Sequence, residues 1–180
     1  MPRCIAFLRA LNVGGHTVKM TQLKSIFDSL GYSDVETFIA SGNVIFNTKG
    51  TPSSAMALKI ESRLKEELGY EVETFLRTDA EVAALSQLVA FSPEEVESAH
   101  MVYFGFLRAP LNAAAKEALE AFNTANEVFR HSGKEIHFLT RISMADSKFS
   151  NVKFERQLGV PTTFRNINTI ARLAKKYPPK

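Results

Sequence analysis

The segment Arg9–Gly15 combines residue types that bind anions. An arginine guanidinium can donate two parallel hydrogen bonds to a carboxylate or phosphate, and the amide of Asn12 offers both a donor and an acceptor. Gly14 and Gly15 leave backbone amides free to converge on a negative group. The segment has neither the lysine of a P-loop nor the spacing of a dinucleotide-binding fingerprint. It therefore predicts either a general anion site or a glycine turn whose polar side chains only cap the next helix.

A second polar turn, Ser41-Gly42-Asn43, lies between two runs rich in β-branched and aromatic residues. One interpretation is a hairpin turn that needs a positive φ, in which Asn43 satisfies local backbone groups. The other is a docking point, because the turn presents the Ser41 hydroxyl and an amide at a hairpin tip. Serine catalysis is not predicted, since no base is marked nearby and the Gly-x-Ser-x-Gly elbow is absent.

The third segment, Thr163–Thr169, places hydroxyls, a guanidinium and amides directly before a predicted helix. Unpaired backbone amides and the helix dipole favour an anion at such a position. Asn166 or Asn168 is enough to cap the helix, so the remaining polar residues, such as Thr163, Arg165 and Thr169, exceed what capping needs. The structural alternative is that Arg165 pairs with a carboxylate or with strand carbonyls between two halves of the protein.

Positive charge is concentrated in the last third of the chain. Residues 128–180 hold 11 Lys and Arg against 3 Asp and Glu, a net charge of +8, whereas residues 1–127 carry −5. A basic region of this kind suits phosphate-rich partners such as nucleic acids. The alternative is that these side chains only solvate the outer face of the last helix and complement its dipole.

Metal-ligating and nucleophilic residues are few and dispersed. Cys4 is the only cysteine and is expected to be a small buried residue. Of the four histidines, only His131 and His137 share a predicted hairpin, and no carboxylate accompanies them as a zinc site would need. We therefore predict no metal ion and no cofactor.

The elements that position these segments follow from the apolar pattern. Residues 1–78 predict the order strand, helix, strand, strand, helix, strand, with strands near 4–8, 35–40, 44–46 and 72–77 and helices near 20–30 and 56–68. Two linking helices follow in residues 79–99, each opened by capping-box spacing. Residues 100–180 then repeat the order and end in a further helix.

The predicted fold class is α+β, with duplicated ferredoxin-like (βαββαβ) halves whose antiparallel sheets are covered by helices. The halves are residues 1–78 and 100–180, joined by 79–99; one continuous sheet across both is the alternative. We expect the repeat to lie in the order of elements and not in residue identity. The residues expected in the core are Phe7, Leu8 or both, together with Ile39, Phe46, Val102 and Phe104.

Three stretches together resemble one bacterial family: Phe7–Gly15 with Met20 and Leu23, Thr37–Phe46, and Pro161–Thr169. It is the family of uncharacterised proteins catalogued as domain of unknown function 1697, and the resemblance covers residues 3 to about 175. Ala10 stands where the family pattern commonly has glycine, and Phe38 where it has tyrosine. The resemblance implies a duplicated ferredoxin-like fold, but no activity, cofactor or catalytic residue.

Composition limits the remaining classes of function. A chain of 180 residues that is 45% hydrophobic and 23% charged is expected to be globular. No apolar run reaches the roughly 20 residues of a membrane span, and Arg9 interrupts the only candidate signal core, so a cytoplasmic protein is expected. The function we expect is binding of a small anionic ligand at loops 9–15, 41–43 and 163–169. Nucleic-acid binding through the basic last third and a purely structural role are the alternatives; the sequence leaves catalysis and oligomeric state open.

Overall fold

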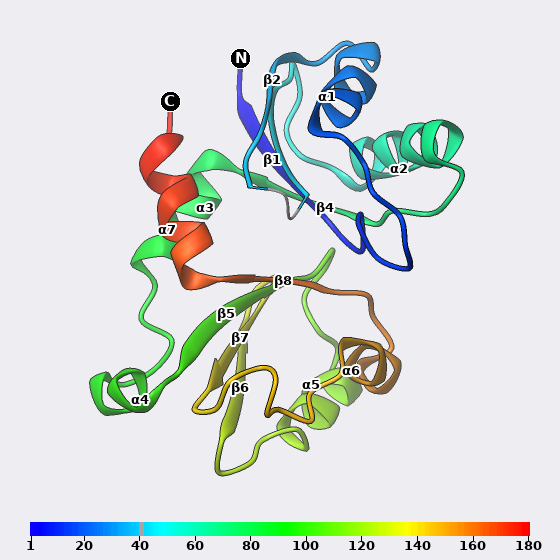
Figure 1. The fold of residues 1–180 in the computed structure, drawn as a ribbon. Coiled ribbons are helices and arrows are strands. Elements are labelled where there is room, and N and C mark those ends of the chain that lie inside the picture. Colours follow the sequence, from blue (N-terminus) through cyan, green and yellow to red (C-terminus); the bar gives the residue numbers. More distant parts are fainter. Residues whose placement is uncertain (40–41) are drawn as a thin grey trace. The chain divides into compact units, whose positions relative to one another are not determined.

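The computed structural model describes residues 1–39 and 42–180 (Figure 1). Backbone proximity groups them into two compact units. The first unit comprises Met1–Leu85 with Arg172–Lys180, and the second comprises Ser86–Ala171. The domain boundaries at 78 and 100 stay a prediction.

The first unit contains a four-stranded antiparallel sheet in the order β2-β3-β1-β4. Its elements are β1 (Arg3–Leu8), α1 (Met20–Ser29), β2 (Ser33–Thr37), β3 (Asn43–Asn47), α2 (Ser54–Leu68), β4 (Thr74–Thr78) and α3 (Asp79–Gln87). One face of this sheet packs on α1 and α2, which contribute Leu23, Phe27 and Ile60 to a continuous core with Phe46. The period-two alternation of the strands places Phe46 on the face of the sheet that meets these helices.

The second unit contains an equivalent sheet in the order β6-β7-β5-β8. Its elements are α4 (Pro93–Ser98), β5 (Met101–Phe106), α5 (Ala113–Glu120), β6 (Glu127–Ser132), β7 (Glu135–Thr140), α6 (Asn151–Leu158), β8 (Thr163–Asn166) and α7 (Ile167–Lys176), which continues into the first unit at Arg172. Its core is rich in phenylalanine: the Phe129 and Phe138 rings stack with centroids 4.3 Å apart.

The fold class is therefore α+β with two duplicated βαββαβ arrangements, as predicted. The strands form two separate four-stranded sheets, which excludes the alternative of one continuous sheet among the described strands. Both predicted capping boxes form. The Glu81 amide donates to Thr78 Oγ1 at 3.0 Å, and the Thr78 amide donates to Glu81 Oε2 at 2.7 Å. Ser92 and Glu95 make the same reciprocal pair.

The expectation that the repeat is absent from residue identity is wrong. When the two sheets are aligned on Arg77 and Arg165, Phe7 corresponds to Phe106. Phe7 pairs with the residue two positions before Arg77, and Phe106 pairs with the residue two positions before Arg165. The residues that follow are identical: Leu8-Arg9-Ala10 aligns with Leu107-Arg108-Ala109. Asn12 then aligns with Asn112 if Pro110 is treated as a one-residue insertion in the second copy. The repeat is hidden in sequence because the remaining core positions have diverged.

The prediction of Ile39 in the core is also wrong. The strand β2 ends at Thr37, and the next residues turn toward β3, where the Phe38 amide donates to the Asn43 carbonyl at 2.9 Å. Ile39 has a φ of 60° and is 40% exposed. A β-branched side chain favours a strand, but at Ile39 the chain has already left the sheet. The other residues expected in the core (Phe7, Leu8, Phe46, Val102 and Phe104) are buried.

In the described part of the chain, no helix has the length and apolar character needed to cross a membrane.

Candidate functional site

The connection between β1 and α1 begins with Arg9, whose backbone is tied to the start of β4. The Arg9 amide donates to the Glu73 carbonyl at 2.9 Å, and its guanidinium Nη1 lies 3.0 Å from Glu73 Oε2. The Arg9 side chain is 28% exposed, so solvent reaches the guanidinium although it is ion-paired.

Two anchors hold the rest of this connection. The Asn12 side-chain oxygen accepts a hydrogen bond from the Val18 amide at 2.9 Å, and the Leu11 carbonyl accepts one from the Tyr70 hydroxyl at 2.7 Å. Leu11 and Val18 are buried, whereas residues 13–17 between them are exposed. The connection is thus an exposed loop that is fixed at both ends.

The backbone of this connection takes the left-handed conformation repeatedly. Ala10, Gly14 and Gly15 have φ values of 55°, 69° and 85°. Glycine adopts such angles at little cost, whereas alanine meets a clash between its Cβ and the backbone. A glycine would therefore be favoured at position 10 on physical grounds.

One contact in the loop joins two aromatic rings that lie far apart in the chain. The His16 ring stacks on the Tyr70 ring, with centroids 3.9 Å apart and an angle of 21° between the planes. Tyr70 lies between α2 and β4, as does Glu73, so one short segment supports the loop at two points. The two rings are 54 positions apart in the chain, and no local pattern signals their contact.

The turn before β3 lies beside the end of β1. The Leu8 amide donates to the Gly42 carbonyl at 2.8 Å, and a Cβ on Gly42, where φ is 78°, would lie 3.1 Å from Leu8 Cβ. Asn43 is fully buried and its amide nitrogen donates to the Phe38 carbonyl at 2.8 Å, so it closes the turn. Ser41 lies outside the described residues.

Thr163–Thr169 lies in the second unit and carries its arginine inward. Arg165 is 7% exposed, and its Nη1 donates to Thr163 Oγ1 at 2.9 Å and to the Phe164 carbonyl at 2.8 Å. Burial lowers the pKa of the Arg165 guanidinium to about 10, so it stays charged at neutral pH. Asn166 caps α7 as predicted, accepting from the Thr169 amide at 2.8 Å.

The first unit contains the same arrangement at the end of β4. Arg77 is 1% exposed and its Nη1 donates to the Leu76 carbonyl at 2.8 Å, and the next residue, Thr78, caps α3. The strand–arginine–cap–helix sequence therefore occurs twice, once in each unit. This repetition favours a structural role for Arg165, and its contact with a ligand stays a prediction.

A carboxylate supports the start of the fourth strand in both units. The Thr74 amide donates to Glu61 of α2 at 2.7 Å, and the Thr162 amide donates to Glu155 of α6 at 2.8 Å. Because both units have this contact, it is part of the duplicated framework and not a feature of one unit.

The two units differ where β1 and β5 lead into their first helices. In the second unit Asn112 caps α5 directly, accepting from the Ala115 amide at 2.8 Å. In the first unit residues 13–19 are inserted between Asn12 and the start of α1 at Met20. We name residues 13–19 the inserted loop.

Within the first unit, the predicted site residues on Arg9–Gly15 and the turn at Gly42–Asn43 lie together, because Leu8 and Gly42 are hydrogen-bonded. The predicted meeting of these loops with Thr163–Thr169 of the second unit stays a prediction.

Several cations of the basic last third have partners inside their own unit. Arg130 pairs with Glu95 at 2.8 Å, Arg141 donates to the Ala125 carbonyl at 2.9 Å, and Lys176 pairs with Glu36 at 3.1 Å. The two ion pairs offset part of the positive charge that a nucleic acid would meet.

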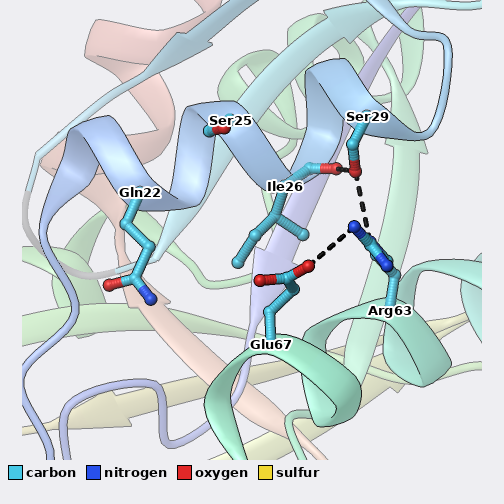
Figure 2. A pocket seen from close by; sticks show the side chains of 6 residues that line it. All are labelled: Gln22, Ser25, Ile26, Ser29, Arg63 and Glu67. Carbon is cyan, nitrogen blue, oxygen red and sulfur yellow. Dashed lines mark hydrogen bonds and ion pairs between the residues drawn. The ribbon is translucent and has the colours of Figure 1, made fainter.

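A hollow of about 160 Å³ lies between α1 and α2 (Figure 2), and none of its lining residues is a predicted site residue. Three of its polar groups contact one another: Arg63 pairs with Glu67 at 2.6 Å and donates to Ser29 Oγ at 3.2 Å. The remaining lining residues are Gln22, Ser25 and Ile26. This mutual pairing leaves the hollow without a clear ligand chemistry.

Other groups with reactive chemistry lack the arrangement that catalysis requires. Burial, then the nearby Glu81 charge, raises the pKa of the Cys4 thiol to about 12, which keeps it protonated. Ser132 Oγ lies 2.8 Å from His137 Nε2, but no described residue bonds to the buried Nδ1 to orient the ring as a base. Among residues 1–39 and 42–180, no three side chains of His, Cys, Asp or Glu gather as a metal site.

Comparisons with known proteins identify a family and a fold. The conserved bacterial protein SP0830 from Streptococcus pneumoniae has a similar structure, with a TM-score of 0.70, 22% sequence identity and 98% of each chain covered. That likeness shows the fold alone. No curated protein matches the chain significantly. The profile of the family described as "Protein of unknown function (DUF1697)" matches residues 1–137, which include two of the three resembling stretches. The chain therefore belongs to the DUF1697 family, as its motifs predicted.

Proposed function

We propose that the protein binds a small anionic ligand, bearing a phosphate or a carboxylate, at the inserted loop. The observation that supports this proposal is the difference between the two copies of one connection. Asn112 completes the strand-to-helix connection of the second unit without any insertion. The fold therefore does not require residues 13–19, and extra residues in surface loops commonly serve binding.

The residue types around the inserted loop suit an anion. Gly14 and Gly15 are exposed, so a ligand can approach their backbone closely. Arg9, at the base of the loop, can present its guanidinium to a carboxylate or phosphate in a bidentate manner. Glu73 holds that guanidinium in place, and in doing so it competes with the ligand for the same positive charge.

The test is binding of inorganic phosphate, pyrophosphate and citrate, measured by calorimetry and by the shift in melting temperature. Arg9→Ala should weaken binding roughly tenfold or more, because a charge-assisted hydrogen bond contributes about 1.5–3 kcal/mol. Glu73→Gln should strengthen binding, since it removes a competing negative charge while keeping the shape of the side chain.

The matched control is Arg108→Ala. Arg108 is exposed and occupies the position equivalent to Arg9 in the copy that lacks the inserted loop. It should leave anion affinity unchanged. The proposal is wrong if no anion binds the wild-type protein, or if Arg9→Ala and Arg108→Ala weaken binding equally.

A further inference from the structure

His16 adds a feature that a simple anion does not need. Its ring is exposed on the inserted loop and one of its faces lies against Tyr70, at 3.9 Å between centroids. The Tyr70 ring is itself held, because its hydroxyl donates to the Leu11 carbonyl at 2.7 Å. The stack is therefore a supported, flat surface at the protein exterior.

This surface lies next to the glycines of the same loop. A Cβ built on Gly14 would be 3.9 Å from His16 Cδ2, so the edge of the imidazole ring adjoins the Gly14 backbone. If the negative group of a ligand approaches Gly14 and Gly15, the ligand atoms bonded closest to that group would therefore lie beside the His16 ring.

We infer that the ligand carries a flat aromatic ring close to its phosphate, as a nucleoside monophosphate does, and that this ring stacks on His16. The inference rests on the proposed function and names the class of its ligand. Stacking of a base on an aromatic side chain increases affinity by roughly 5- to 100-fold. The duplicated connection of the second unit has neither the glycine pair nor a histidine, so this chemistry is particular to the inserted loop.

The experiment compares three probes by calorimetry: inorganic phosphate, ribose 5-phosphate and adenosine monophosphate. The wild-type protein should bind adenosine monophosphate at least about fivefold more tightly than ribose 5-phosphate. His16→Ala should abolish this difference and retain the affinity for ribose 5-phosphate. His16→Phe should preserve the difference, because phenylalanine keeps a stacking face.

Thr17→Ala is the matched control, since Thr17 is the exposed neighbour of His16 and should leave all three affinities unchanged. If phosphate binds but the base adds nothing, or if His16→Ala leaves the gain intact, the inference fails and the anion site survives. If none of the three probes binds and citrate and pyrophosphate also fail, the proposed function itself is wrong.

Discussion

Ala10 holds a backbone angle that an L-residue other than glycine adopts only with strain. Its φ is 55°, at the point where Arg9 leads into the inserted loop. A left-handed conformation costs a non-glycine residue roughly 1–2 kcal/mol, and strain of this kind is concentrated at functional sites. Its counterpart Ala109 precedes a proline, in a connection of different length.

We expect Ala10→Gly to raise the free energy of unfolding by about 0.5–1 kcal/mol, measured by urea denaturation. Relief of strain exceeds the roughly 0.4–1 kcal/mol that glycine costs through the entropy of the unfolded chain. Ala84→Gly is the opposing control, because Ala84 is exposed within α3, where glycine should lower stability by about 1 kcal/mol. Equal losses in the two variants would show that Ala10 is not strained.

The strands β5 and β8 pack so closely at one point that a methyl group would not fit between them. Gly105 of β5 lies opposite Phe164 of β8, and a Cβ there would be 2.6 Å from the Phe164 ring. That ring is enclosed by Phe149 and Phe154, at 5.6 and 5.7 Å between centroids, so it has little room to move.

Gly105→Ala should therefore destabilise the protein by about 1–3 kcal/mol through overpacking. Phe164→Leu should reverse part of that loss when the two substitutions are combined, because the shorter side chain vacates the space. Urea denaturation of the four proteins in this double-mutant cycle measures the coupling. Additive losses would mean that the two residues do not compete for space.

The order of elements could be predicted because its signals are local. Apolar spacing reveals a helix within a few residues, and the capping boxes at Thr78 and Ser92 need only a partner three positions on. The burial of Arg165 could not be predicted, because no local pattern indicates which face of the strand this side chain takes. The His16–Tyr70 stack was missed for a related reason: it depends on tertiary contact between distant segments.

At the scale of the whole molecule, the acid stability of the fold depends on His137. Burial, followed by the charges of His131 and Arg130, lowers the pKa of this imidazole from 6.5 to about 4. The unfolded chain therefore binds a proton near pH 6.5, whereas the folded protein resists protonation until about pH 4. We therefore expect the contribution of His137 to the free energy of unfolding to be retained above pH 6.5 and lost as the pH falls from 6.5 to 4, by roughly 3 kcal/mol in total.

His137→Gln should flatten this part of the pH profile, because glutamine does not titrate. The measurement is the free energy of unfolding between pH 4.5 and 7, and the control is His100→Gln, at an exposed histidine directly before β5 whose charge does not act on His137. Parallel profiles for the wild type and His137→Gln would show that another group governs the loss in acid.

The connection from the first strand to the first helix has a different length in each unit, and this difference indicates where insertions and deletions can be tolerated. Between Asn12 and α1 the chain accommodates seven additional residues, whereas the helices after Arg77 and Arg165 start with no spacer beyond their cap. Codons can be gained or lost within residues 13–17, between the anchored Asn12 and Val18, without disturbing the strand or the helix that the connection joins. At the two arginine junctions a single inserted codon would separate the cap from its strand. We therefore expect changes in chain length to be tolerated in the first connection, and not at the two arginine junctions.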